Sequence, residues 1–313
     1  MMPDMYQVIR SWRSDFLPIR SVNYHVQVWG EPAPGRTPIV MLHGWMDVAA
    51  SFQFVVDALQ PDTYIIAPDW RGFGQSRVAQ ADTFWFPDYL ADLDFLLLHY
   101  APLDESGQVG QPAQFDLVGH SMGGNVSMLY AGIRPERVRR LVNLEGFGMP
   151  ATRPEQAPGR YAQWLEQLQQ LHNGAMDMRS HDSVDSVARR LMKTNPRLNA
   201  DRALWLASHW AREETPGEWR IQGHPAHRIS NAQLYRLDET LEVHKCITAP
   251  TLAVEASHNS LEQWWNSRYS LDEYHQRLKV VRNLEIACID NAGHMLHHDQ
   301  PEQLARLLER FLA

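Results

Sequence analysis

The sequence is poor in cysteine and has no long apolar run. Its two cysteines, Cys246 and Cys288, stand far apart, which excludes a disulfide scaffold. Each lies in or beside an apolar, strand-like segment, so we expect buried free thiols. No stretch approaches 18 consecutive apolar residues, and no segment is therefore expected to span a membrane. Residues 1–16 are charged and lack the apolar core of a secretory signal, which predicts a cytoplasmic protein.

Positive charge is also scarce. Lys and Arg number 29 against 37 Asp and Glu, which gives a net charge of -8. No Lys/Arg-rich run offsets this balance, so a nucleic-acid partner is not expected. The chain has 313 residues, of which 44% are hydrophobic. That size and composition allow one large α/β domain with an inserted subdomain.

Short apolar runs alternate with helix-like stretches in the first half of the chain. A helix is expected over residues 87–100, where leucines recur at helical intervals after Pro87. Strands are expected over residues 22–29, 38–42, 64–67, 115–118 and 138–144. This alternation predicts an α/β fold with a mostly parallel twisted sheet and helices on both faces.

The pattern changes between residues 149 and 245, where the chain is polar and helix-rich without a convincing buried strand. Strand-like runs resume at 249–254 and 284–289, and a final helix is expected over 301–312. We therefore predict an α/β core formed by residues 1–148 and 246–313. A helical cap, residues 149–245, is inserted into it.

One pentapeptide, Gly119-His120-Ser121-Met122-Gly123, indicates a catalytic residue. It lies between the strand-like run 115–118 and a helix-like stretch, as the nucleophile elbow of a serine hydrolase does. Small residues two before and two after the serine let strand and helix approach closely. Ser121 is therefore the candidate nucleophile.

A serine nucleophile needs a base and an oxyanion hole. The base candidate is His294, which follows the last strand-like run and precedes the last helix. The backbone N–H groups of Met122 and Trp45 are the expected oxyanion donors, with Gly44 allowing the backbone to approach the substrate.

Two further histidines, His297 and His298, compete with His294 for the role of base. We expect them to cap or line the start of the last helix. His294, His297, His298 and Asp299 offer the residue types of a metal site, but neither a second ligand cluster nor a His-Glu-x-x-His helix supports one, so no metal and no cofactor are expected.

Four motifs in order resemble the α/β-hydrolase fold superfamily, over a range from about Val22 to the C-terminus. They are His43-Gly44-Trp45, the stretch from Asp69 to Ser76, the elbow around Ser121, and Gly293-His294. Asp69 and Arg71 are expected to pair and hold their loop. Within the superfamily, the segment from His43 to Phe52 is similar to the serine-hydrolase-like proteins.

The triad acid departs from the common pattern. Many relatives carry an aspartate after the strand at 250–254, where this chain has Asn259. In the haloalkane-dehalogenase-like branch, a glutamate after the strand that follows the nucleophile acts as the acid. The resemblance therefore implies Glu145, which could otherwise only cap the start of the insertion. Glu255 is the rival acid, and Asn259 could act as a weakened orienting group.

The elbow serine also excludes some chemistry. Dehalogenases and epoxide hydrolases of this fold carry aspartate there, so Ser121 implies acyl transfer. The first choice is a carboxylesterase acting on a small-molecule acyl substrate. Alternatives are a thioesterase, a lactonase, a carbon–carbon bond hydrolase or a non-catalytic binding protein. The expected pocket residues are His43, Gly44, His120, Phe147 and Met149, and the sequence does not indicate an oligomeric state.

Overall fold

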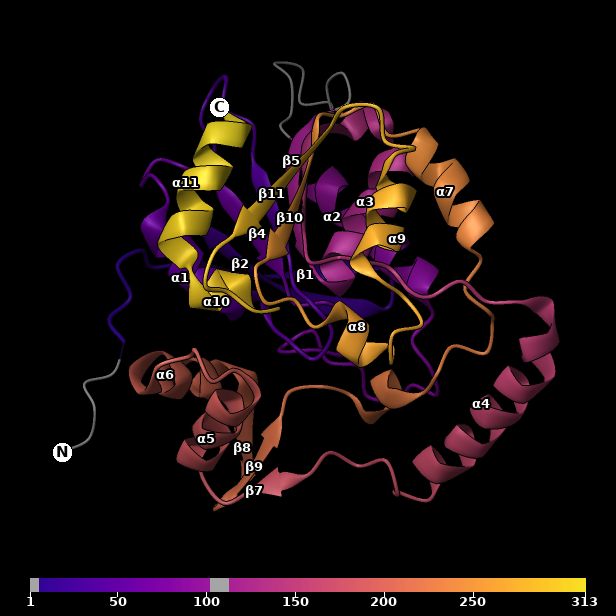
Figure 1. Cartoon of the computed structure of the whole chain (residues 1–313). Helices are drawn as coiled ribbons and strands as arrows, with labels where there is room; N and C mark the ends of the chain where they lie inside the picture. Colours follow the sequence, from indigo (N-terminus) through magenta and orange to yellow (C-terminus); the bar gives the residue numbers. More distant parts are fainter. Residues whose placement is uncertain (1–5, 102–112) are drawn as a thin grey trace.

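A computed structural model describes residues 6–101 and 113–313. An eight-stranded sheet crosses the molecule in the order β1-β2-β4-β3-β5-β6-β10-β11 (Figure 1). Only β2 runs against its neighbours, β1 and β4, and the remaining pairs are parallel. The strands are β1 (Arg13–Ile19), β2 (Val22–Trp29), β3 (Ile39–Leu42), β4 (Ile65–Pro68), β5 (Phe115–His120), β6 (Val138–Leu144), β10 (Thr251–Ala256) and β11 (Leu284–Ile289).

Helices cover both faces of this sheet, as the sequence predicts. The helices α2 (Phe86–His99), α3 (Met122–Ile133), α7 (Leu237–Lys245) and α9 (Leu271–Leu278) lie on one side. The helices α1 (Gln53–Ala58), α10 (Leu296–Asp299) and α11 (Pro301–Leu312) lie on the other. The expected apolar face of α11 is buried through Leu304, Leu307, Leu308 and Phe311. A separate hydrophobic core therefore fills each side of the sheet.

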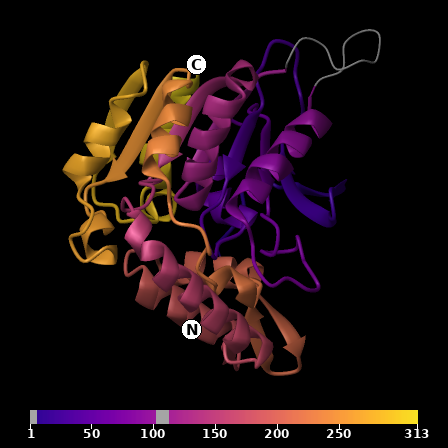
Figure 2. The same ribbon diagram turned by 90° about the vertical axis from the view of Figure 1, so that its right-hand side faces the viewer.

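Most of the segment between residues 149 and 245 lies below the sheet in Figure 1, and Figure 2 shows the same placement from the side, whereas its last helix, α7, packs against α3. Besides helices, it contains a three-stranded antiparallel sheet in the order β7-β9-β8, which the sequence pattern did not indicate. The elements before α7 are α4 (Ala157–His172), β7 (Ser180–His181), α5 (Val184–Thr194), α6 (Ala200–Trp210), β8 (Ala211–Thr215) and β9 (Glu218–Ile221).

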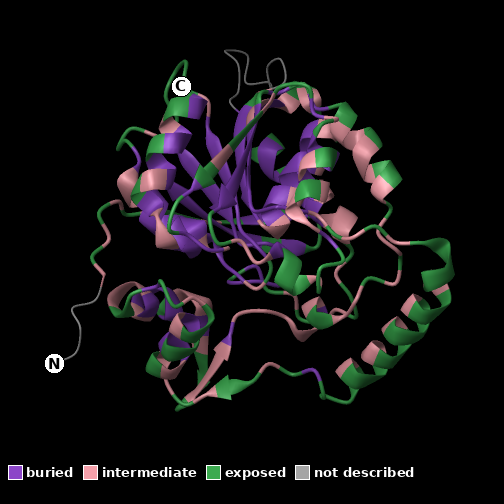
Figure 3. Cartoon of the chain, viewed as in Figure 1, coloured by how far each residue is buried: buried purple, intermediate pink, exposed green. Residues whose placement is uncertain are grey.

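This segment is packed unevenly. The helices α5 and α6 share a small hydrophobic core with Val48, Ala50 and Phe54 of the main domain. In contrast, neither α4 nor α7 buries any residue, and Figure 3 shows α4 as exposed and half-buried along its whole length. Within the described residues, no helix combines the length and apolar character needed to cross a membrane.

Two expectations from the sequence are wrong. Cys246 and Cys288 are free, but both are exposed. Cys246 ends α7, whose residues stay at the surface, and Cys288 lies on β11 at the edge of the sheet, which is covered less than its centre.

Asp69 and Arg71 do not pair with each other. The Arg71 guanidinium binds Asp92 through Nε (2.5 Å) and Nη2 (2.7 Å). Asp69 instead contacts the His25 ring (2.8 Å) and accepts from the N–H groups of Ala49 and Gln75. Both residues therefore hold the loop after β4, but through different partners.

The sheet order determines where a site can form. From β3 the chain continues to β4 on one side, whereas the other neighbour of β3 is β5. In open α/β sheets, such a switch point leaves a crevice at the carboxyl ends of the strands. The loops after β3 and β5 meet there.

Candidate functional site

Ser121 lies on a strained bend between β5 and α3. Its backbone has φ 52° and ψ -113°, a left-handed region that non-glycine residues rarely adopt. The Ser121 N–H donates to the Leu144 carbonyl of the neighbouring strand (2.8 Å). A Cβ on Gly119 would overlap the Gly123 carbonyl, and one on Gly123 would overlap the Leu42 carbonyl. The two glycines thus permit the close approach expected of an elbow.

His294 and Glu145 come together across the sheet edge. Nδ1 of His294 lies 3.3 Å from Oε2 of Glu145. Oε1 of Glu145 accepts a hydrogen bond from the N–H of Ala256 (2.7 Å), and its own N–H donates to the Val254 carbonyl (3.0 Å). The Glu145 side chain is fully buried, and that of His294 is 20% exposed. The carboxylate is therefore fixed to the end of β10 while it faces the imidazole.

Burial shifts the pKa values of this pair in opposite directions. Desolvation raises the pKa of Glu145 to about 8; the neighbouring Glu255 adds to the shift, and the Ala256 N–H reduces it. Desolvation lowers the pKa of His294 to about 4, with Asp47 partly offsetting the effect. His294 is thus a neutral imidazole near pH 7, the form in which a histidine can accept a proton.

The two rivals for the acid have other partners. Oε1 of Glu255 lies 2.6 Å from Nε2 of His275 on α9. Oδ1 of Asn259 accepts from the N–H of Leu261 (3.3 Å), at the start of the short helix α8 (Leu261–Trp264). Neither contacts His294 in the described part of the chain.

His120, the residue before Ser121, has a contact that sequence reasoning missed. Its Nε2–H donates to the His294 carbonyl (2.8 Å), and the two rings lie 4.7 Å apart between centroids. The side chain is buried, so it faces the protein rather than solvent. His120 therefore links the elbow to the loop that carries His294. No sequence signal identifies this contact, because it joins residues 174 positions apart.

The loop after β3 lies against the elbow. An ideal Cβ on Gly44 would stand 3.0 Å from Nδ1 of His120 and 3.2 Å from Cβ of Ser121. Among the described residues, no acceptor is found for the backbone N–H of Trp45 or of Met122. The Trp45 indole is 53% exposed and donates to the His227 carbonyl (3.1 Å), which ties this loop to the inserted segment.

The other expected pocket residues differ in exposure. His43 is fully buried; its Nδ1–H donates to the Gly44 carbonyl (2.7 Å), and its Nε2 accepts from the N–H of Trp70 (2.9 Å). Phe147 is buried edge-to-face against Tyr274. Met149 is exposed. Substrate contact by these residues stays a prediction.

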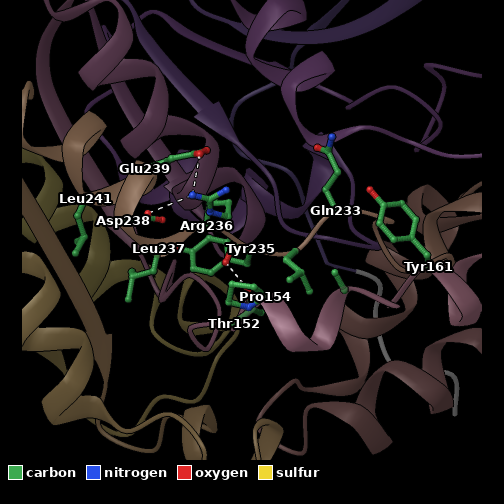
Figure 4. A pocket seen from close by; sticks show the side chains of 12 residues that line it. Thr152, Pro154, Tyr161, Gln233, Tyr235, Arg236, Leu237, Asp238, Glu239 and Leu241 are labelled. Atoms are coloured by element: carbon green, nitrogen blue, oxygen red, sulfur yellow. Dashed lines mark hydrogen bonds and ion pairs between the residues drawn. The ribbon is translucent and has the colours of Figure 1, made fainter. Parts of the chain in front are cut away.

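A cavity of about 860 Å³ lies elsewhere, between the start of α4 and the start of α7. Figure 4 shows Thr152 donating to the Tyr235 carbonyl, and Arg236 paired with Asp238 and Glu239. None of the expected catalytic residues lines this cavity. The cavity lies between the first and the last residues of the inserted segment, close to its two connections with the core.

Of the two expectations for His297 and His298, capping is wrong, whereas both residues lie on α10, which directly precedes and contacts the last helix α11. No side-chain cap bond forms at the start of α10 or α11. Instead, Nε2 of both imidazoles contacts the Ser51 hydroxyl, at 3.1 Å and 2.5 Å. Together with Asp47 they form a group of possible metal ligands whose donor atoms all lie within 4.8 Å of one another. Asp299 is not part of it, because its oxygens accept from Asn195 and from the Gly293 N–H.

Comparisons with known proteins agree with this architecture. The sequence model of the α/β hydrolase fold matches residues 37–301. The chain is 26% identical over 295 residues to a serine hydrolase-like protein of Danio rerio, covering 91% of this chain and 84% of that protein. It is 23% identical over 286 residues to serine hydrolase-like protein 2 of Homo sapiens, covering 88% and 86%. Among solved structures, the thioesterase domain from the curacin biosynthetic pathway superposes with a TM-score of 0.76 at 20% identity, covering 96% of this chain and 99% of that one.

Proposed function

The chain belongs to the α/β hydrolase fold family, and from that premise we propose that it cleaves carboxylic esters with Ser121, His294 and Glu145 as a catalytic triad. The observation that carries this proposal is the 3.3 Å contact between Nδ1 of His294 and Oε2 of Glu145, in a chain whose elbow serine is held at positive φ. A carboxylate on Nδ1 fixes the tautomer in which Nε2 is free to act as a base.

The proposed reaction is acyl transfer through a covalent intermediate. Nε2 of His294 takes the Ser121 proton while the serine oxygen attacks the ester carbonyl. The backbone N–H groups of Trp45 and Met122 donate to the oxyanion, since neither has an acceptor within the described chain. His294 then protonates the leaving alcohol, and a water activated by the same imidazole releases the acid. The ionised Glu145 stabilises the imidazolium that forms at each step.

The main alternative is cleavage of a thioester, a lactone or a carbon–carbon bond by the same groups. The fold similarity to a thioesterase domain keeps this alternative in view, although a scaffold alone does not determine the substrate. Parallel assays with matched esters, thioesters and lactones distinguish these activities. The proposal requires the highest kcat/KM on an ester.

The direct test replaces the nucleophile. We expect Ser121→Ala to lower hydrolysis of a p-nitrophenyl acyl ester by at least about 10⁴-fold, because the covalent step is lost. Labelling by a fluorophosphonate should disappear as well. Circular dichroism checks that the variant is folded.

Ser257→Ala is the matched control. Ser257 also contacts a histidine, with its hydroxyl 3.0 Å from Nδ1 of His258, but it stands at the exposed end of β10. This variant should keep full turnover and full labelling. Retained turnover in folded Ser121→Ala would refute the proposed function.

A further inference from the structure

Beneath the loop that carries His294, two histidines and one aspartate point toward a common centre. His297 and His298 lie on α10, and Asp47 lies on the loop after β3. All three are buried, with exposed fractions of 0%, 4% and 4%. Their ligand atoms lie within 4.8 Å of one another, and Nε2 of His297 is 3.8 Å from Oδ2 of Asp47.

The convergence of the two imidazoles is unusual for their spacing. Adjacent residues on a helix do not face each other, because they project about 100° apart. Here both Nε2 atoms nevertheless contact the same hydroxyl, that of Ser51. Ser51 belongs to the short 3-10 helix η1 (Ala49–Phe52), which packs against α10. Four side chains from two separate segments of the chain therefore surround one small volume.

Two buried atoms of this group, Oδ2 of Asp47 and Nδ1 of His297, lack a hydrogen-bond partner among the described residues. The other carboxylate oxygen of Asp47, Oδ1, accepts from the N–H of Val48 (2.9 Å). Buried carboxylate oxygens are normally paired with a donor or bound to a metal. Arg202, a cationic side chain that contacts α10, does not fill this need, since it donates to the His298 carbonyl and to Glu302.

We infer that Asp47, His297, His298 and Ser51 form a site for a divalent first-row transition metal ion, with Zn²⁺ as the best fit. Two imidazole nitrogens and one carboxylate oxygen are common zinc ligands, at about 2.0–2.2 Å from the ion. In a tetrahedral arrangement such ligands stand about 3.4 Å apart, so the 3.8 Å between Nε2 of His297 and Oδ2 of Asp47 must contract slightly, and the most distant donor atoms, within 4.8 Å of one another, by up to about 1.4 Å. The Ser51 hydroxyl supplies the fourth donor.

Binding does not require the histidines to lose a net proton. The single hydroxyl proton of Ser51 can serve only one Nε2, so the other imidazole carries its proton on Nε2. When the ion binds, that imidazole must carry the proton on Nδ1 instead. Nδ1 of His297 is buried and has no partner among the described residues, so it can take this proton, but the resulting N–H has no protein acceptor there and its burial opposes the gain from binding.

The site lies between two loops that carry expected catalytic residues. Asp47 lies on the same loop as Trp45, and His297 follows the loop of His294. An ion shared by them would join these two loops beneath the elbow. A site closed by four protein ligands is of the structural type, with no open position for a substrate. The inference does not depend on the proposed esterase activity.

The test measures the metal directly. The full chain is stripped with EDTA, exposed to ZnCl₂, desalted and analysed for zinc by mass spectrometry. We expect one Zn²⁺ per chain and a rise in Tm of about 3–6 °C in excess zinc. Asp47→Asn and His298→Asn should each reduce the retained zinc at least tenfold. An unloaded wild-type chain, or full loading of both variants, would overturn the inference.

Two controls locate the ion. His172→Asn removes a surface histidine that pairs with Asp82 (2.9 Å) and should leave zinc retention unchanged. Glu145→Gln, which disturbs the neighbouring His294 pair, should also retain the ion. If Glu145→Gln loses zinc while Asp47→Asn keeps it, the ion binds at His294 and the inference is wrong.

A spectroscopic readout covers the case in which the variants do not fold. X-ray absorption of the zinc-loaded wild-type chain should show two imidazole nitrogens and oxygen ligands at about 2.0–2.2 Å. A sulfur shell, or a single imidazole, would place the ion elsewhere and refute the assignment.

Discussion

At the scale of single residues, the surroundings of two glutamates distinguish their roles. Glu145 ends β6 and faces His294, while Glu255 lies on β10 and contacts His275. Both are buried, and Glu255 raises the pKa of Glu145 by repulsion in addition to the larger desolvation effect. Of these two glutamates, Glu145 is the one that contacts His294 and can stabilise a proton on its imidazole.

We therefore expect Glu145→Gln to lower kcat by about 10³- to 10⁴-fold, because an amide cannot stabilise the imidazolium. Glu255→Gln is the matched control and should change kcat less than about tenfold, since its partner is His275. Steady-state hydrolysis of a p-nitrophenyl ester measures both variants. The reverse order would transfer the role of acid to Glu255.

The pH profile adds a second readout for the same substitution. With the pKa of Glu145 raised to about 8, a larger fraction of this carboxyl is ionised as the pH rises. In the wild-type chain, kcat/KM should therefore increase between about pH 6 and about pH 9. Glu145→Gln should lose this rise. A flat wild-type profile would show that ionisation of Glu145 does not limit turnover.

The sequence identifies residues whose role depends on local pattern. Ser121 is predicted from a pentapeptide, whereas Glu145 is implied by the resemblance to a family branch that carries a glutamate after the same strand. The contact from His120 to His294 and the group formed by Asp47 with His297 join distant segments. A single sequence does not contain that information, because these contacts exist only once the sheet has formed.

At the scale of elements, the elbow depends on close packing between β5, α3 and the loop after β3. Gly123 stands where any Cβ would overlap the Leu42 carbonyl, which is backbone and cannot move aside. Gly159 on α4 has no atom within 4 Å of the equivalent position. The two glycines therefore differ in the space around them, although both are helical.

Gly123→Ala should lower the free energy of unfolding by at least about 3 kcal/mol, because the added methyl group has no room. Gly159→Ala should raise it by about 0.5–1 kcal/mol through better helix propensity. Urea denaturation followed by circular dichroism measures both. An unchanged midpoint for Gly123→Ala would contradict the packing described here.

Helices and strands could be predicted where their buried residues recur at regular intervals in the sequence. Strands β2, β6 and β11 and helix α11 have the bounds expected from the sequence. Strand β1 was missed because it contains Pro18 and several polar residues, as an edge strand can. The short strands β7, β8 and β9 consist mostly of exposed or half-buried residues and lack the alternation that reveals a strand with one buried face.

At the scale of the whole molecule, buried histidines set the response to acid. Burial lowers the pKa of several of them, among which are His43, His120, His227 and His294. Between their lowered pKa values and the ordinary value of 6.5, the folded chain binds fewer protons than the unfolded chain. Stability is therefore present above about pH 6.5 and is lost as the pH falls through the folded pKa values.

We expect the free energy of unfolding to fall between pH 7 and pH 5, by up to about 1.4 kcal/mol per pH unit for each such histidine. Glu145 acts in the opposite sense: its contribution is present below about pH 4.5 and lost as the pH rises through about 8. Urea midpoints at constant ionic strength, with EDTA present, measure the sum. Equal midpoints at pH 7 and pH 5 would contradict this expectation.

Glu145, the proposed acid, is attached to β10 and not to the segment 149–245, which we expect to contact the substrate. Its N–H and its carboxylate are both bound to backbone groups of the sheet, at Val254 and Ala256. The residues between 149 and 245 start after this anchor and end before β10 begins. Residues 149–245 can therefore be exchanged with those of a related protein to change which substrates are accepted. We expect Glu145 and His294 to keep their geometry in such a chimera.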